Sequence, residues 1–480
     1  MARPSRKAER AERGGGPAAC DLLIRNAYVI TMDERRTVYP SGAVAVTGNT
    51  IVAVGPEREV TKQVRARHVL DAHGAPVHPG LIDTHYHATL HTTRGAITDD
   101  PKAFVHLGNE PHPYSRWFNA MTDEDEHASA LLACVEMVRN GFTAFMEAGT
   151  VFEPDTCAKA AEEVGIRASV SEPFLWDVDG AFPMTHEIER APTDPKRARG
   201  LLGSQLWRNR DADALVRGHV TLYGMGTATD ELTLAAKRCA DENKVVLTQH
   251  QSFEPDDAAF DDRRFGKPPL VHFAEIGALG PNTTFVHMNI IRDEEVEPIA
   301  TSGMSVVWHP GNYQFYSIAL ARRSRMPELA ERGVNLTFGT DAAKVWTFGE
   351  LAWIGYLVAR EEGGYLPAER ILEMQTIGAA RAIGLDRQVG SLEPGKKADL
   401  VIRTEELAEA QPGLNVIREL VLVSRSKSVD TVIIDGQIVV RHGRLTLADE
   451  ALVYARARES ARRLVDKVGL TPGTIWPTVA

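Results

Sequence analysis

The chain is poor in cysteine, with four in 480 residues and no Cys-x-x-Cys pair among them. Cys20, Cys134, Cys157 and Cys239 lie far apart in the sequence. This pattern fits reduced thiols better than a disulfide framework or a cysteine-based zinc site. The scatter indicates reduced thiols and predicts a cytoplasmic location.

Long apolar runs and an excess of positive charge are also lacking. No window approaches the ~20 consecutive apolar residues of a membrane span, so no membrane association is expected. The net charge is −11, and the only basic run is the opening "MARPSRKAERAERGGGPA", which argues against nucleic acid as a partner. This run contains no apolar segment, so it is not a secretory signal, and we expect a disordered leader over residues 1–18.

The composition that remains is that of a globular protein, 43% hydrophobic and 25% charged, and the length predicts two or three domains. Both ends of the chain, residues 19–78 and 389–449, are rich in strand signals. "GAVAVTGNTIVAVG" has a turn at Gly48 and "TVIIDGQIVVRHGRL" has one at Asp435, and each pattern is typical of a hairpin. Residues 450–480 are expected to form a terminal helix and tail.

The middle of the chain, residues 79–388, alternates short apolar strands with helical patterns. One helix is expected from a Thr122 cap to Gly141, and another between Asp230 and Asn243. The predicted strands are "GLIDTH", "FTAFME", "IRASVS", "VTLYGM", "KVVLTQH", "TTFVHMN", "SVVWHP" and "VNLTFGTD". Eight strands, mostly followed by helices, indicate an α/β fold of the (β/α)8 barrel type rather than an open sheet.

The stretch "PGLIDTHYHATLHTTRG" places His85 and His87 at the end of the first barrel strand. Side chains alternate faces along a strand, so the two rings point the same way. Neutral imidazole is the commonest protein ligand for zinc-like ions. The pair is therefore half of a metal site, unless both rings are hydrogen-bonded surface histidines.

Three further candidates lie at equivalent places in other strands. His250 closes "KVVLTQH", His287 lies near the end of "TTFVHMN", and Asp341 closes "VNLTFGTD". Barrel active sites are built at the C-terminal ends of the strands. A buried aspartate there is costly unless it is paired or binds a metal. Any one of these residues could be structural, His287 as a satisfied core histidine, but together they predict a metal site.

From residue 20 onward the chain resembles the amidohydrolase superfamily, specifically its cytosine-deaminase-like and triazine-hydrolase-like branch. The resemblance rests on "PGLIDTHYH", "TQH", "FVHMN", "LTFGTD" and the late "TIGAARAIGLDRQVGSLEPGKKADLVI". It implies a distorted (β/α)8 TIM barrel with a small β-sandwich built from both chain ends. Relatives are often dimers or larger, so a homo-oligomer is expected by analogy.

The resemblance also implies a ligand set. His85, His87, His250 and Asp341 would bind one divalent metal ion, and His287 would be a further ligand or would touch the metal-bound water. No lysine occurs in "HVTLYGM", where binuclear relatives carry a carboxylated bridging lysine, so a single ion is expected. Zinc is the expected metal, with iron, cobalt and manganese as alternatives that suit the same donors.

The chemistry that this site implies is hydrolysis. A metal-bound hydroxide would attack a trigonal carbon, and a carbon–nitrogen bond would break. Asp341 would carry the proton to the leaving nitrogen, while His287 would orient the hydroxide or stabilise the developing oxyanion. Asp341 and His287 are therefore the predicted catalytic residues.

Two departures from the family pattern bear on the substrate. Many relatives carry a glutamate three residues after the fifth-strand histidine, but "HQSFEPDD" has Phe253 there and Glu254 one place later. A slip of one residue turns a side chain to the other face unless the loop bulges. After the seventh strand, Trp308 stands where relatives usually carry a histidine, and His309 follows it. Glu254, Trp308 and His309 are the predicted substrate-binding residues.

Because the metal set is complete and deaminase-specific groups are missing, we expect hydrolysis of a non-peptide amide, urea or carbamate. The second hypothesis is a deaminase of an aminopyrimidine, triazine or purine-like ring, with Glu254 brought into place by a bulge. The third is a non-catalytic scaffold, which the intact ligand set disfavours. An apolar or aromatic small-molecule substrate is favoured by the aromatic residues expected near the barrel mouth, which are Trp117, Phe118, Trp176, Trp308, Tyr313, Phe315, Tyr316 and Trp346.

Overall fold

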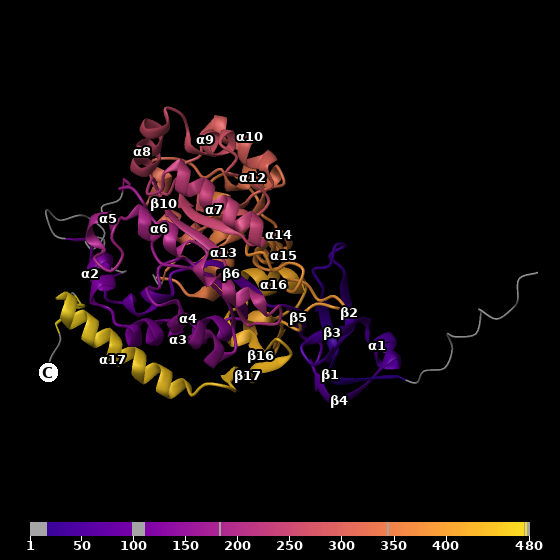
Figure 1. Ribbon diagram of the computed structural model, residues 1–480. Helices are drawn as coiled ribbons and strands as arrows, with labels where there is room; N and C mark the ends of the chain where they lie inside the picture. Colours follow the sequence, from indigo (N-terminus) through magenta and orange to yellow (C-terminus); the bar gives the residue numbers. More distant parts are fainter. Residues whose placement is uncertain (1–16, 98–110, 182–183, 343–344, 475, 478–480) are drawn as a thin grey trace, which may run out of the picture.

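The computed structural model describes residues 17–97, 111–181, 184–342, 345–474 and 476–477. Most of the expected leader, residues 1–16, lies outside this range. Among the described residues, no helix is long and apolar enough to cross a membrane. The outline is a helix-covered core of parallel strands with a separate strand-rich region at one side (Figure 1).

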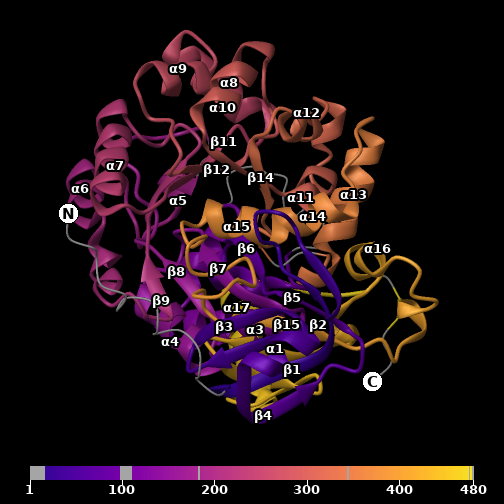
Figure 2. The same ribbon diagram turned by 90° about the vertical axis from the view of Figure 1, so that its right-hand side faces the viewer.

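Strands from the two ends of the chain pair in one nine-stranded sheet, as expected for a region built from both termini (Figure 2). The turn between its C-terminal strands β16 and β17 has the left-handed backbone that a two-residue hairpin needs, with φ of 51° at Asp435 and 77° at Gly436. The domain boundaries themselves stay a prediction. The strands of this sheet are β1 (Ala18–Ile30), β2 (Val38–Thr47), β3 (Thr50–Pro56), β4 (Val64–Asp71), β5 (Pro76–Pro79), β15 (Leu400–Arg403), β16 (Val429–Ile434), β17 (Gln437–Arg441) and β18 (Arg444–Leu445).

The middle of the chain forms the parallel strands of a distorted barrel. They divide into a four-stranded sheet, β6 to β9, and a five-stranded sheet, β10 to β14. Only His219 separates β9 from β10, and a parallel bridge between Tyr86 and Asp341 joins the other two edges. The strands are β6 (Leu81–Tyr86), β7 (Phe142–Glu147), β8 (Arg167–Val170), β9 (Val216–Gly218), β10 (Val220–Gly224), β11 (Leu247–Gln251), β12 (Thr283–His287), β13 (Ser305–Trp308) and β14 (Asn335–Phe338). All eight sequence-predicted strands are therefore present, and the fourth, expected from Val220, is preceded by the short β9, from which His219 separates it.

The helices between the strands begin and end where their capping residues predict. Helix α3 (Asp123–Arg139) starts at a Thr122 capping box, and α7 (Asp230–Asn243) starts at a Thr229 cap. The terminal helix α17 (Glu450–Val468) packs along α3 (Figure 1). Further helices are α1 (Glu57–Gln63), α2 (Pro113–Ala120), α4 (Pro154–Val164), α5 (Met184–Glu187), α6 (Pro195–Leu201), α8 (Pro255–Phe265), α9 (Pro269–Glu275), α10 (Asp293–Ser302), α11 (Pro310–Phe315), α12 (Met326–Glu331), α13 (Leu351–Glu361), α14 (Ala368–Gln375), α15 (Ile377–Ala382) and α16 (Val416–Leu422).

The first barrel strand is fixed in place by close packing at its start. Every residue of β6 and of its neighbour β7 is buried, as is usual for parallel strands covered on both faces. Gly80, just before β6, leaves no room for a side chain, because a Cβ there would lie 1.9 Å from Thr143 Oγ1. The glycine of the "PGLIDTH" motif thus lets β6 approach β7 and sets where the histidines at its other end lie.

A buried ion-pair cluster joins the barrel to the C-terminal strands. Arg167 in β8 lies with its Nε 2.7 Å from Asp399 Oδ2 and its Nη2 2.6 Å from Asp435 Oδ1. The Arg167 and Asp399 side chains are 3% and 0% exposed. Removal of one partner from a buried pair leaves an uncompensated charge, which is strongly destabilising.

We therefore predict that Arg167→Leu lowers the free energy of unfolding by about 3–5 kcal/mol, because Asp399 would stay buried without its cation. Chemical denaturation followed by circular dichroism measures the change. Arg332→Leu, which removes a half-exposed ion pair with Glu297, is the control and should cost about 1 kcal/mol or less. Equal losses in the two variants would contradict the assigned role of the cluster.

Candidate metal centre

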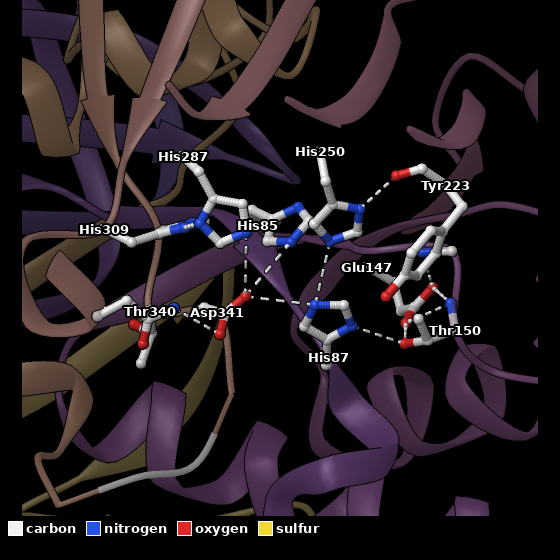
Figure 3. A network of polar contacts seen from close by, with 12 residues as sticks. His85, His87, Glu147, Thr150, Tyr223, His250, His287, His309, Thr340 and Asp341 are labelled. Atoms are coloured by element: carbon white, nitrogen blue, oxygen red, sulfur yellow. Dashed lines mark hydrogen bonds and ion pairs between the residues drawn. The ribbon is translucent and has the colours of Figure 1, made fainter. Parts of the chain in front are cut away.

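Four histidines and one aspartate meet at the C-terminal ends of the barrel strands. His85 lies in β6 and His87 directly follows it, His250 lies in β11, and His287 ends β12. Asp341 follows β14, where its backbone N–H donates to the His85 carbonyl at 3.0 Å. Figure 3 shows the imidazole rings gathered around the Asp341 carboxylate. The structure thus brings together every residue that the sequence predicts as a metal ligand.

One oxygen of Asp341 is the centre of the cluster. Asp341 Oδ1 lies 3.3 Å from His87 Nε2, 3.8 Å from His85 Nε2 and 4.0 Å from His287 Nε2. His250 Nε2 lies 3.3 Å from His87 Nε2. One donor atom from each of His85, His87, His250 and Asp341 lies within 4.8 Å of all the others. The nearest of these separations match the spacing of about 3.3 Å that follows for neighbouring donors in a tetrahedral zinc site.

Burial keeps the imidazoles in the form that binds metal. Burial lowers the pKa of His250 to about 4, and it lowers the pKa of His85 and His287 well below the usual value, with neighbouring histidines adding to the effect. A neutral imidazole has a free lone pair on one ring nitrogen, whereas a protonated ring has none. Near neutral pH the rings of His85, His250 and His287 therefore each have a ring nitrogen whose lone pair can bind a metal ion.

Hydrogen bonds behind the rings fix how they face the cluster. His250 Nδ1 donates to the Tyr223 carbonyl at 2.6 Å, which leaves the lone pair on Nε2, the atom directed at the cluster. His87 Nδ1 lies 3.0 Å from Thr150 Oγ1, and that hydroxyl donates to Glu147 at 3.0 Å. Partners of this kind orient metal ligands and tune their basicity.

Asp341 has a partner of its own, since Asn312 Nδ2 donates to Asp341 Oδ2 at 2.7 Å. This hydrogen bond holds one carboxylate oxygen and directs the other, Oδ1, at the imidazoles. The backbone at Asp341 has a φ of 72°, and His287 has a φ of 69°. Such values are uncommon for residues with a side chain and store strain, which tends to occur at functional sites.

His287 and His309 contact each other through their rings. The two Nδ1 atoms are 2.9 Å apart, so one of them donates a hydrogen to the other. His287 thereby turns its Nε2 towards Asp341 Oδ1. His309 follows β13 and lies behind His287, and the pair belongs with Asp341 to a second group of possible ligands.

The residues fit a divalent cation of the zinc class. Neither ring nitrogen of His85 makes a hydrogen bond to any described residue, although the side chain is buried. Buried polar atoms without a partner are rare and costly, and a bound metal ion supplies the missing partner. Three imidazole nitrogens and one carboxylate oxygen are a usual donor set for zinc, iron, cobalt or manganese.

A cavity of about 90 Å³ opens beside the cluster. His87, His250, His287 and Asp341 form its polar side, and Asp341 is the only carboxylate among the described residues that line it. Most of the remaining lining is apolar or aromatic, and the aromatic residues are Tyr114, Phe118, Phe174, Tyr223, Phe253 and Tyr316. Of the aromatic residues expected from the sequence, Phe118 and Tyr316 are among the lining residues, while Trp117, Trp176 and Trp308 are core residues at 0% exposure.

The three predicted substrate-binding residues do not line this cavity among the described residues. Glu254 is the N-cap of α8, and burial together with nearby Asp256 raises its pKa. Trp308 lies in the core, and His309 lies behind His287. The neighbour of Glu254, Phe253, is the one that enters the cavity, with its ring centre 4.5 Å from that of His287. The assignment of Glu254, Trp308 and His309 to substrate binding stays a prediction.

Sequence reasoning missed the residues that support the ligands. Thr150, Tyr223 and Asn312 were not singled out, because they lie in the loops or strands next to the ligands and carry no motif of their own. Asn312 follows "WHPG" closely, and its position after a predicted barrel strand was the only available signal. The structure adds these three residues to the site.

Comparison with known proteins is consistent with this geometry. The family model described as "Amidohydrolase family" matches residues 77–439. A 5-methylthioadenosine/S-adenosylhomocysteine deaminase from Syntrophobacter fumaroxidans is 31% identical over 94% of this chain and 99% of its own length. A 5'-deoxyadenosine deaminase from Methanosarcina mazei is 30% identical over 93% of this chain and 99% of its own length.

Solved structures have the same fold. An adenosine deaminase from Xanthomonas campestris with bound zinc superimposes with a TM-score of 0.82 at 26% identity, over 94% of this chain and 100% of the other. A mutant of an atrazine chlorohydrolase from Arthrobacter aurescens, complexed with zinc and atraton, gives a TM-score of 0.78 at 21% identity, over 92% of this chain and 100% of the other. The second likeness concerns the fold alone.

We predict that His85→Ala reduces the metal content of zinc-reconstituted protein to below about a tenth of the wild-type value, because one of four ligands is lost. Since His85 makes no side-chain hydrogen bond to described residues, the change should leave the fold intact. Mass spectrometry of the metal content measures the effect. His219→Ala removes an equally buried histidine that contacts Ser169 instead, and it should retain the metal. Full metal occupancy in His85→Ala would contradict the ligand assignment.

Proposed function

This chain belongs to the amidohydrolase family and is thus a hydrolase of carbon–nitrogen bonds other than peptide bonds, and we propose that it cleaves an amide, urea or carbamate. Its substrate is a small molecule, which we propose to be neutral and apolar or aromatic. The observation that carries the proposal is the makeup of the cavity, whose described lining has a single carboxylate and six aromatic residues.

The enzyme depends on a divalent metal, which we propose to be one zinc ion per subunit. His85, His87, His250 and Asp341 would hold it. When bound, such an ion supplies a nucleophile at neutral pH by lowering the pKa of a coordinated water molecule toward about 7. Support for zinc comes from the donor set and from the zinc bound in the adenosine deaminase structure.

Asp341 is the chain's own proton carrier in this proposal. It is the only carboxylate among the described residues of the cavity, so it is the acid that can hold a proton and give it to the leaving nitrogen. Asn312 donates to Oδ2 while Oδ1 faces the imidazoles, so the carboxylate is held in a fixed orientation for this task. His287 lines the same cavity, and its contact with His309 turns Nε2 toward the reacting group, where it can orient or stabilise a developing oxyanion.

The position of Phe253 supports an open-chain substrate. Deamination of a heteroaromatic ring needs a second acid to protonate a ring nitrogen, but the side chain that enters the cavity after β11 is a phenyl ring. Glu254, one residue later, is a helix cap outside the cavity. Cleavage of an amide, urea or carbamate needs the nucleophile and one proton carrier, and both roles can be filled here.

A second candidate is a deaminase of an adenosine-like base. The observation that favours it is the near-complete coverage of two groups of curated relatives, both deaminases of adenosine derivatives. This function requires Glu254 to reach the cavity by movement of the loop before α8. A non-catalytic scaffold has no support, since the ligand set is complete. Cytoplasmic location and homo-oligomerisation stay predictions.

The two candidates predict different products. We expect zinc-loaded enzyme to release the amine from aryl ureas, anilides or aryl carbamates and to leave 5'-deoxyadenosine and aminopyrimidines unchanged, because the cavity offers one acid. Liquid chromatography of the reaction mixtures, with an ammonia assay, measures both outcomes. Ammonia from a nucleoside or an aminopyrimidine, with no cleavage of the open-chain panel, would contradict the proposal.

Glu254→Gln tests the same choice within the protein. We predict a fall in kcat of less than about threefold, because Glu254 lies outside the cavity, whereas a deaminase using it as proton donor should lose about 10²–10⁴-fold. Steady-state kinetics on the best substrate found measure the change. Asp256→Asn, an exposed acid two residues away, is the matched control. A large loss confined to Glu254→Gln would favour the deaminase.

A further inference from the structure

A second, smaller cavity lies at the other end of the barrel, where the nine-stranded sheet meets it. Its volume is about 20 Å³, and Leu81, the first residue of β6, is among its lining residues. The metal ligands lie at the opposite end of the same strand. The cavity also borders α14 and α16, which pack side by side (Figure 2). It is therefore separate from the metal centre.

Arg403, the last residue of β15, brings a buried positive charge to this cavity. Its side chain donates from Nε to His78 Nε2 at 3.0 Å and from Nη1 to Ser428 Oγ at 3.0 Å. His78 Nδ1 donates to the Pro79 carbonyl, so the ring is neutral and Nε2 is an acceptor. Neither partner carries a negative charge.

No carboxylate compensates the Arg403 charge. The residue is 7% exposed, and no aspartate or glutamate among the described residues lies within 4.0 Å of its nitrogens. Burial lowers the pKa of Arg403 to about 10, and no acidic neighbour opposes this effect. The group is still a cation at neutral pH. A buried charge without a counter-ion is strongly destabilising, so a group that compensates the Arg403 charge has to be identified.

Two more polar groups face the same cavity. The Gln375 side chain is 4% exposed and makes no hydrogen bond to any described residue. Arg425 lies at the cavity too, donates only to backbone carbonyls, and forms no ion pair with a described residue. The Nη2 of Arg403 likewise has no acceptor among described residues. The described lining therefore offers several N–H donors and no acid.

We propose that this cavity binds a single small monovalent anion, chloride under physiological conditions, between Arg403 and the Gln375 amide. A cavity needs about 10–15 Å³ of free volume for one water-sized occupant, so a volume of about 20 Å³ has room for one small ion. Arg403 favours an anion over water, because an anion compensates its buried charge, and the half-buried Arg425 adds a second positive charge at the cavity.

The anion would hold together segments that are far apart in the sequence. Arg403 belongs to β15, Gln375 ends α14, and Arg425 follows α16. An anion bound among them adds a contact between the nine-stranded sheet and the helices around the barrel. Its binding stabilises the folded state by an amount that rises with the logarithm of the anion concentration above Kd, since the unfolded chain has no such site. This inference does not depend on the proposed function.

Bromide, a heavier halide, reveals the site directly. Crystals of the wild-type protein soaked in bromide should give an anomalous difference peak in contact with Arg403 Nη2 and the Gln375 amide. The same soak of Gln437→Leu, a change at an exposed position of strand β17, should give the same peak. Absence of the peak, with an ordered water molecule in its place, would overturn the proposal.

Thermal unfolding gives an independent measure in solution. Replacement of gluconate by chloride at constant ionic strength and pH should raise the Tm of the wild-type protein by about 2 °C or more. Gln375→Leu should lose this rise, while Gln437→Leu should keep it. Gln375 is used because Arg403 variants leave His78 and Ser428 without their partner and can fail to fold. An equal chloride-dependent rise in Gln375→Leu would overturn the assignment.

Discussion

The convergence of three imidazoles and one carboxylate on a single point is the constraint on which the rest of the site depends. His85, His87 and His250 bring ring nitrogens together with Asp341 Oδ1 in a region shielded from water. This arrangement is costly without a cation, because the carboxylate is buried and His85 has no other hydrogen-bond partner among the described residues. A bound divalent ion removes the free-energy cost of burying these groups, so metal binding accounts for the arrangement of the four side chains.

The surrounding structure fixes the orientation of the side chains that would bind the metal. The parallel strands place the ligands at one end of the barrel, and the glycine before β6 sets the position of the first pair. The hydrogen bonds of His87 with Thr150, of His250 with the Tyr223 carbonyl and of Asp341 with Asn312 then fix ring and carboxylate orientation. The left-handed backbone at Asp341 is part of the same arrangement, since strain at that residue is offset by the contacts that its side chain makes.

The proposed substrate class depends on which of two consecutive residues after β11, Phe253 or Glu254, lines the cavity. Asp257 accepts hydrogen bonds from the backbone N–H groups of Phe253 and Glu254 at 3.0 and 3.1 Å, which fixes the start of α8. With the backbone held there, Phe253 faces His287 and Glu254 caps the helix. Among the described residues the cavity consequently has one acid and several aromatic rings, which is the observation behind the proposed open-chain substrate.

Much of this could be predicted from the sequence, because strong local signals agreed with the global fold. The alternation of apolar strands and capped helices predicted the barrel, and the strand-end histidines with Asp341 predicted the metal ligands. The short β9, which His219 separates from the fourth strand, could not be foreseen, since it depends on how two sheets meet. Thr150 and Asn312 were missed because hydrogen bonds behind a ligand leave no spacing pattern. The sequence could not decide whether the Glu254 side chain enters the cavity, because "HQSFEPDD" is equally compatible with a helix cap and with a bulged loop.

Anomalous diffraction at the zinc absorption edge, from crystals of the zinc-loaded protein, tests the central claim most directly. The account predicts one anomalous peak per chain, bounded by His85, His87, His250 and Asp341 at distances of about 2.0–2.3 Å. A map without a peak at that point, or with zinc bound only elsewhere, would contradict it.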